Sequence, residues 1–195
     1  MPGLPSYADA MPELVDPHPR YQSSFLASVG EILAAGEEER STGLATIPAI
    51  AGSPGESFTL DELRDPHRFS TYIGRLRSLA DPTTALPPGI VPVTQLWWVD
   101  GDEYLGRLAI RHSLTPWLLE FGGHIGYAVR PSARRRGHAT AMLAAALPVA
   151  RRLGIDPALL TCDDTNGASR RVIEANGGVL EDQRGEKLRY WVPTS

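Results

Sequence analysis

The sequence has a single cysteine, Cys162, and no long apolar run. One thiol cannot form a disulfide within the chain, and sparse cysteine use fits a reducing compartment. No stretch approaches the roughly 20 apolar residues that a membrane helix needs. The first residues show neither the basic start nor the apolar run of a signal peptide. These absences predict a soluble, cytoplasmic protein without a membrane partner.

An excess of basic charge is also missing. The chain has 19 Lys and Arg against 23 Asp and Glu, which gives a formal net charge of −4. Domains that bind nucleic acids are usually basic, so no nucleic-acid partner is expected. The local cluster Arg134–Arg136 is therefore expected to meet a small anion.

The length of 195 residues and the 42% hydrophobic content suit one domain with a sizeable core. Residues 1–13 are rich in proline and are expected to be loose. Residues 14–90 are expected to form a helical part on the substrate side, and residues 91–195 a strand-rich core.

Two helices are predicted in the N-terminal part. Apolar residues recur along one side of Tyr21–Ala35. Thr59 followed by Glu62 is typical of a capping box. A helix is then expected to break at the next proline and to resume over residues 68–79.

From residue 92 onward the pattern changes to strands. They are expected at 93–99, 104–111, 124–129, 158–162, 179–182 and 187–192, with a short one at 14–15. The strand–helix–strand order over 124–162 predicts a parallel pair with a right-handed crossover. The hairpins predict antiparallel pairs elsewhere. The expected fold class is therefore α/β (or α+β): a mixed, mostly antiparallel twisted sheet of about six to seven strands, flanked by about four helices. The last strand is a candidate edge for a homodimer.

Residues 124–147 combine a strand, an arginine-rich turn and the start of a helix. The first turn of a helix leaves backbone N–H groups without partners, and the helix dipole makes that end partly positive. Gly137 would let a phosphate approach the backbone closely. This arrangement predicts a pyrophosphate cradle. Pro148 lies inside the helix and is expected to kink it or end it early.

The same residues resemble the GNAT N-acetyltransferases. The cofactor motif of that family is Gln or Arg, two residues, Gly, one residue, then Gly or Ala, and here it falls on Arg134–Ala139. Residues 163–178 resemble the later helix of the family, in which an Asn and a small residue near the start face the cofactor. The resemblance covers about residues 90–195, and it implies that the parallel pair is central and splayed.

What the resemblance implies is acetyl-CoA as co-substrate, without a metal. The implied cofactor-binding residues are Ala128, Val129, Arg134, Arg135, Arg136, Gly137, His138, Ala139, Thr140, Asn166 and Ser169.

Each of these residues has an implied role. The backbone N–H groups of 134–140 would hold the pyrophosphate, and the pantetheine arm would pair along Ala128 and Val129. Arg135 and Arg136 would either add charge or lie in solvent. His138 occupies the variable position of the motif and is expected to be exposed.

The later helix has two implied cofactor contacts. Asn166 and Ser169 would face the cofactor, and Asn166 is alternatively only a helix cap.

The implied reaction is direct attack of a primary amine on the thioester through a tetrahedral intermediate. The N–H of Val129 would hold the oxyanion. The amine must be neutral to attack, so a base is expected. His124 stands where relatives often have an acidic residue, and it is either this base or a structural histidine. Glu120 and His112 are the next candidates.

The general acid is harder to place. The family's usual tyrosine position corresponds to Ile173. Tyr190 or Tyr127 could replace that tyrosine, although Tyr127 is expected to pack in the core, and water could serve instead. Cys162 is expected to be a small buried hydrophobe.

The expected acceptor is a small-molecule amine. Two alternatives stay open: a protein N-terminus or lysine, and a non-catalytic acyl-CoA-binding or regulatory module, which the missing tyrosine favours. Specificity is expected to lie in residues 1–90 and near Leu114–Phe121. The four tryptophans, Trp97, Trp98, Trp117 and Trp191, are candidates for an apolar pocket wall, and each is more often part of a core.

Overall fold

The computed structural model describes residues 11–37, 42, 44, 46–50 and 54–195, so most of the segment 1–13 lies outside the described residues. The strands are β1 (Glu13–Val15), β2 (Thr46–Ile47), β3 (Glu56–Ser57), β4 (Val93–Asp100), β5 (Glu103–Arg111), β6 (Ile125–Val129), β7 (Ala158–Asp163), β8 (Val179–Arg184) and β9 (Lys187–Val192). The longer helices are α1 (Gln22–Ala34), α3 (Pro66–Ser78), α4 (His138–Arg152) and α5 (Gly167–Ala175). The short helical turns are η1 (Pro19–Tyr21), η2 (Glu62–Arg64), the π-helical η3 (Leu118–Gly122) and η4 (Pro131–Ala133).

The expected seven strands form two antiparallel sheets, in the orders β1-β4-β5-β6 and β7-β9-β8, beside the small β2-β3 pair. The parallel neighbours β6 and β7 meet at only one end, where the N–H of His124 donates to the carbonyl of Leu159 at 2.7 Å. Among the described residues no further backbone hydrogen bond joins them, although β7 has a partner, β9, on its other edge only. The predicted splay is confirmed, and it divides the predicted single sheet into two.

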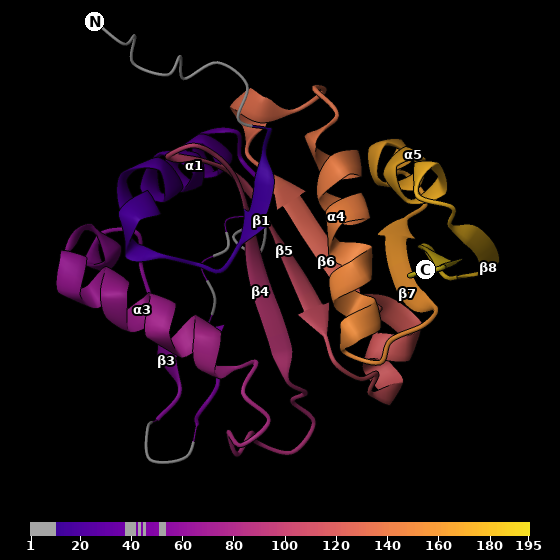
Figure 1. The fold of residues 1–195 in the computed structure, drawn as a ribbon, viewed down its shortest axis with the longest axis horizontal. Helices are drawn as coiled ribbons and strands as arrows, with labels where there is room; N and C mark the ends of the chain where they lie inside the picture. The colour runs from indigo at the N-terminus through magenta and orange to yellow at the C-terminus, as the bar shows by residue number, and fades with distance from the viewer. Residues whose placement is uncertain (1–10, 38–41, 43, 45, 51–53) are drawn as a thin grey trace, which may run out of the picture.

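Neighbouring tryptophans on β4 serve two separate cores. Trp97 packs with the aromatic residues of α1 and α3, among them Phe25 and Phe69. Trp98 packs with α4 through residues such as Met142. Successive side chains of a strand point to opposite faces, so the sheet is covered on both sides. Figure 1 shows α1 and α3 on one side of β4, β5 and β6, and α4 with the second sheet on the other.

A buried arginine connects the N-terminal helix to the strands. Arg130 follows β6, forms an ion pair with Glu31 of α1, and donates to the carbonyl of Tyr104 at 3.1 Å and to Glu103 at 3.2 Å. Ser132 adds its backbone N–H to the same Glu31 carboxylate at 3.0 Å. The helical part and the strand-rich core are therefore held together by polar as well as apolar contacts.

The helix starts follow the expected cap chemistry. The N–H of Thr59 donates to Glu62 at 2.8 Å, and the N–H of Glu62 returns a bond to the Thr59 hydroxyl at 3.3 Å, which confirms the capping box. Asp65 accepts from the N–H of Arg68 and caps α3. Proline is favoured in a first helical turn, so α3 begins at Pro66, two residues earlier than predicted.

The predicted early end of the central helix at Pro148 is wrong. α4 continues to Arg152. Ala146 and Ala150, on either side of the proline, are fully buried in the core. Packing of that face outweighs the hydrogen bond that the proline removes from the carbonyl of Ala144.

The expectation that the last strand forms a sheet edge is also wrong. β9 lies between β7 and β8, so β8 is the edge. Val179 and Leu180 on β8 have exposed fractions of 68% and 46%. The order could not be seen in the sequence because a β8–β9 hairpin can add to β7 through either strand.

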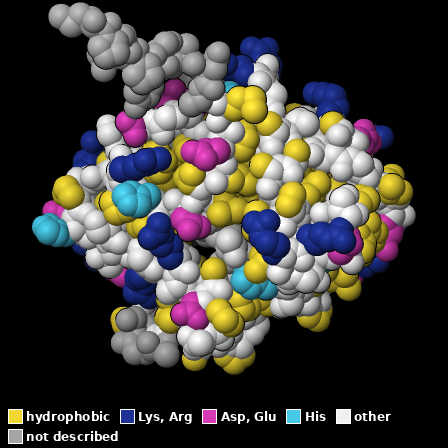
Figure 2. All heavy atoms as spheres, in the orientation of Figure 1, with side chains coloured by type: hydrophobic (Ala, Val, Ile, Leu, Met, Phe, Trp, Pro, Cys, Tyr) yellow, Lys and Arg dark blue, Asp and Glu magenta, His cyan; other side chains and the backbone are white. Residues whose placement is uncertain are grey.

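Within the described residues, no helix combines the length and apolar character needed to cross a membrane. Figure 2 shows basic and acidic side chains interspersed on the face in view, rather than gathered in one basic patch.

Candidate functional site

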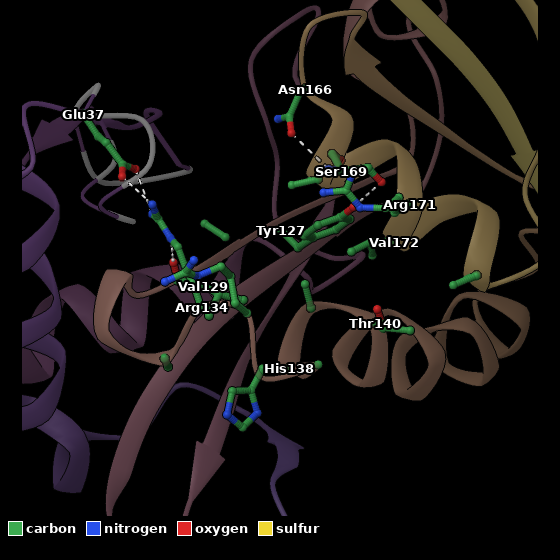
Figure 3. Close-up of a pocket in the computed structure, with 17 residues that line it drawn as sticks. Glu37, Tyr127, Val129, Arg134, His138, Thr140, Asn166, Ser169, Arg171 and Val172 are labelled. Atoms are coloured by element: carbon green, nitrogen blue, oxygen red, sulfur yellow. Dashed lines mark hydrogen bonds and ion pairs between the residues drawn. The ribbon is translucent and has the colours of Figure 1, made fainter.

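A cavity of about 730 Å³ lies in the splay between β6, the N-terminus of α4 and α5. Its lining residues come from these elements, from the turn before α4 and from the segment after α1 (Figure 3): Glu37, Tyr127, Ala128, Val129, Ala133, Arg134, Arg135, Gly137, His138, Ala139, Thr140, Asn166, Ala168, Ser169, Arg171, Val172 and Ala175. All the sequence-predicted cofactor residues except Arg136 lie on this wall, and Arg136 is exposed outside it.

The N-terminus of α4 presents unbonded amides to this cavity. The first helical bond runs from the N–H of Ala141 to Gly137, which has no side-chain cap of its own. Among the described residues, no acceptor is bound by the six N–H groups of 135–140. Arg135 and Gly137 have φ values of 60° and 83°, and such a turn directs successive N–H groups into one concavity that suits an anion. The row of unbonded amides expected for a cradle begins at Arg135 and not at Arg134, because the N–H of Arg134 bonds to Pro131.

The edge of β6 supplies further backbone groups. The carbonyl of His124 and the N–H of Arg130 both bond to β5. Backbone groups alternate in direction along an antiparallel strand, so residues 125, 127 and 129 turn theirs away from β5. The carbonyl of Val129 confirms this, because it accepts from Nε of Arg134 at 2.9 Å. A Cβ on Gly106 of β5 would lie 2.5 Å from the Ala128 carbonyl, so the backbone groups of Ala128 face β5. Of the two residues expected to pair with the pantetheine arm, only Val129 therefore presents its N–H to the cavity.

The guanidinium of Arg134 is already paired. It binds both oxygens of the Glu37 carboxylate, with Nη2 at 2.9 Å, and this hydrogen bonding lowers the pKa of Glu37. Glu37 lies 97 positions away in the sequence, so no local pattern could have predicted the pair. Arg135 is the arginine of the motif that lines the cavity without such a carboxylate.

The start of α5 closes the opposite wall. The side chain of Asn166 accepts from the N–H of Ser169 at 3.0 Å, so Asn166 is the helix cap and also lines the cavity. The Ser169 hydroxyl lies 2.8 Å from the hydroxyl of Tyr127 across the splay. Four further residues of α5 line the cavity that were not predicted from the sequence: Ala168, Arg171, Val172 and Ala175. Their spacing of three and four residues marks one helix face and could have identified them.

Comparison with known proteins follows this geometry. Residues 83–179 match the model of the acetyltransferase (GNAT) domain. This part of the chain is a GNAT domain. No curated protein sequence matches the chain significantly.

Solved structures share the GNAT fold. One is the microcin self-immunity acetyltransferase MccE in complex with acetyl-CoA and AMP (TM-score 0.61, 10% identity, 95% of this chain and 93% of that chain covered). A second is RimL, a ribosomal-protein alpha-N-acetyltransferase in complex with coenzyme A (TM-score 0.58, 16% identity, 94% of this chain and 93% of that chain covered). A third is the PaiA N-acetyltransferase from Thermoplasma acidophilum in complex with coenzyme A (TM-score 0.54, 12% identity, 94% of this chain and 99% of that chain covered). At these identities the likeness establishes a common fold.

His138, within the GNAT motif, is not exposed as predicted. The side chain is partly buried, and its Nδ1 accepts from the indole N–H of Trp98 at 3.3 Å. Trp98 lies 40 positions earlier, on a strand that the sequence could not place beside the motif.

His124, the predicted base, stands where β6 and β7 join. Its Nδ1 accepts from the N–H of Leu159 at 2.9 Å. Burial, together with the charge of Arg111, lowers the pKa of His124, which favours the neutral ring. A neutral ring with an accepting Nδ1 carries its proton on Nε2, so it has no free lone pair for a substrate proton. This geometry supports a structural role for His124.

Tyr190, the predicted acid, is buried outside the cavity. Its hydroxyl donates to Glu174 at 3.3 Å, and burial raises its pKa. Tyr127 lines the cavity instead, and burial raises its pKa to about 12. Tyr127 packs against the core as expected, yet its hydroxyl is the one that faces the GNAT cavity.

The remaining candidates have structural partners. Glu120 forms an ion pair with Arg184. His112 lies 2.8 Å from the Thr94 hydroxyl. Cys162 is buried as expected, and burial raises the pKa of its thiol. In the part of the chain that the structure describes, no three His, Cys, Asp or Glu side chains group closely enough to hold a metal ion.

Proposed function

We propose that the protein is an acetyl-CoA-dependent N-acetyltransferase whose acceptor is the amine of a small molecule. The observation that carries the proposal is the row of unbonded amides from Arg135 to Thr140, which opens into the cavity of a GNAT domain. A diphosphate matches these donors in charge and in hydrogen-bonding capacity. The complexes of MccE and PaiA with acetyl-CoA and coenzyme A agree with it.

Bound acetyl-CoA would supply a thioester carbon that an amine attacks, so that a C–N bond forms, the C–S bond breaks and the thiol leaves with one proton. Val129 has the backbone N–H that faces the cavity and can donate to the developing oxyanion. Tyr127 has the hydroxyl that can donate to the leaving sulfur. With the Nδ1 of His124 occupied, the proton of the ammonium group leaves to solvent.

The test of the cradle is titration of acetyl-CoA against wild type and Gly137→Glu by calorimetry. A carboxylate at this position would block the amides and repel the phosphates, so binding should weaken at least 100-fold. Gly154→Glu is the matched control, because Gly154 lies at the other end of the same helix. Its φ of 81° resembles the 83° of Gly137, and a Cβ at either glycine meets nothing within 4 Å.

Both variants place a side chain at positive φ and should lose about 1 to 2 kcal/mol of unfolding free energy. Only Gly137→Glu should lose the cofactor. Equal acetyl-CoA affinity in the two variants would refute the cradle.

Thiol release from acetyl-CoA with a panel of amines separates the alternatives. Turnover of small amines supports the proposal, and turnover of peptides alone would favour a protein acceptor, as for RimL. Tight cofactor binding without turnover of any amine would favour a non-catalytic module.

A further inference from the structure

A second cavity, of about 440 Å³, lies on the opposite face of β5 from α4. Its wall is formed by β4, β5, η3 and the segment before β4: Gly89, Ile90, Val91, Val93, Gln95, Arg107, Ala109, Arg111, Thr115, Trp117 and Leu118. Its volume is in the range of sites for small molecules.

The charged side chains in the lining of this second cavity are arginines. Arg107 and Arg111 line it, and among the described residues its lining has no Asp or Glu. Nη1 of Arg111 donates to the carbonyls of Gly122 and Gly123 at 3.0 and 3.1 Å, which fixes the guanidinium. Burial and the charge of Arg107 lower the pKa of Arg111. Both influences disfavour the cation, so an anion in the cavity would stabilise it.

The part of the second cavity formed by η3 and the residues before it has apolar side chains. Trp117 lines it with 63% of its surface exposed, and its ring centroid lies 6.0 Å from that of Phe121. The second sheet holds this segment: the Thr161 hydroxyl donates to the Phe121 carbonyl at 2.7 Å, and Nε of Arg189 donates to the Leu119 carbonyl at 3.0 Å. Large apolar side chains held exposed beside a cavity indicate a binding surface.

The two cavities are lined by residues of neighbouring strands, β5 and β6. Ala109 and Arg107 pair with Gly126 and Ala128, so these four residues share one face of the sheet. Ala128 also lines the first cavity. A Cβ on Gly126 would meet only the guanidinium of Arg111, at 3.8 Å. At this glycine the Arg111 guanidinium therefore lies directly over β6, the strand that presents the Val129 N–H.

We infer that the second cavity is the acceptor site and that it selects an α-amino acid with an aromatic or aliphatic side chain. This inference rests on the proposed function. The short distance between amine and carboxylate in an α-amino acid matches a guanidinium that lies over β6 itself, at Gly126. The carboxylate would bind Arg111, the side chain would pack on Trp117, and the amine would point across Gly126.

The transfer then keeps the carboxylate intact. The α-amine loses one proton to solvent and forms the C–N bond, while the C–S bond breaks and the thiol leaves with one proton. The product is an N-acetyl-amino acid with one negative charge, which Arg111 still matches.

The test compares amines that differ in one group. L-Phenylalanine carries both features, phenethylamine lacks the carboxylate, and glycine lacks the apolar side chain. Loss of a hydrogen bond to a charged group costs about 10- to 150-fold, so kcat/KM for phenylalanine should exceed that for phenethylamine at least 10-fold. Binding of the three compounds in the presence of coenzyme A is measured by calorimetry as a second readout.

Arg111→Gln should reduce the preference for phenylalanine over phenethylamine to less than threefold. Trp117→Ser should reduce the preference for phenylalanine over glycine, and because Trp117 is largely exposed, this variant keeps the test decisive if Arg111→Gln fails to fold. Arg152→Gln, an exposed arginine at the far end of α4, is the matched control and should keep both preferences.

The outcomes separate the two claims. Phenethylamine acetylated as well as phenylalanine, or peptides acetylated in preference to both, overturns the acceptor inference while the transferase function stands. If no amine is turned over, the proposed function fails. In that case the calorimetric binding data still test the acceptor site. If phenylalanine binds no better than phenethylamine, the acceptor inference is overturned.

Discussion

Arg134 shows how a single residue of the motif can differ from its expected role. Its backbone N–H and both ends of its guanidinium are bonded within the protein, to Pro131, Val129 and Glu37. The cradle amides begin one residue later. The pair with Glu37 places a carboxylate on the wall of a cavity that we assign to a polyanion.

Glu37→Gln is expected to tighten acetyl-CoA binding about threefold to tenfold. The substitution removes a negative charge beside the phosphates and releases Arg134, and a partly exposed ion pair is worth only about 1 kcal/mol. Calorimetry at low and high salt measures the effect, which should shrink as salt screens the charges. Glu186→Gln, on an exposed turn, is the control. Weaker binding by Glu37→Gln would show that the pair instead holds Arg134 in its binding position.

At the scale of elements, the sequence predicted most boundaries because caps and periodicity act locally. Asn166 and Gly137 mark helix starts by their own chemistry, and the structure places each there, while Thr59 forms its capping-box bond with Glu62 at the start of η2. Contacts between distant segments could not be predicted in this way. The bond from Trp98 to His138 and the inner position of β9 depend on how sheets pack, which no local pattern encodes.

The junction of β6 and β7 is an element-scale feature, and His124 provides its two hydrogen bonds with Leu159. The Oδ1 of asparagine can accept the Leu159 N–H as Nδ1 does, but asparagine cannot act as a base. His124→Asn should therefore keep kcat within about threefold, whereas His124→Ala should lose about 1 to 2 kcal/mol of unfolding free energy. A 100-fold loss of kcat in His124→Asn, with its stability retained, would restore the predicted general base.

The same junction makes the stability of the fold decrease as the pH falls below neutral. The pKa of His124 is lowered in the folded state, so below the ordinary value of about 6.5 the unfolded chain takes up a proton that the folded chain resists. Stability should thus fall as the pH decreases from 7 toward 5, by more in wild type than in His124→Asn. Urea unfolding at these pH values measures the difference.

For the whole molecule, the ion pair between Arg130 and Glu31 connects the helical part to the core. Burial by itself would raise the pKa of Glu31, but hydrogen bonds from Arg130 and Ser132 lower it to about 2. A lowered carboxylate pKa stabilises the fold above the unfolded value of about 4.3, and this contribution is lost as the pH falls toward 2.

Glu31→Gln should therefore lose about 1 to 2 kcal/mol of unfolding free energy at pH 7, an amount reduced from the full shift because the carboxylate is partly exposed to solvent. The deficit relative to wild type should shrink between pH 4.5 and pH 3 in urea unfolding. Glu13→Gln, at an exposed position, should show no such trend. A deficit that is constant with pH would mean that packing, not charge, connects the two parts.

The backbone hydrogen bond at the junction of β6 and β7 has a consequence for the strand edge beyond it. His124 and Leu159 join the two sheets at one end of these strands. Each sheet keeps its own hydrogen-bond ladder, so the backbone edge of β6 beyond the junction is not used up by β7. A long extended arm can therefore lie along that edge without displacing a strand from either ladder.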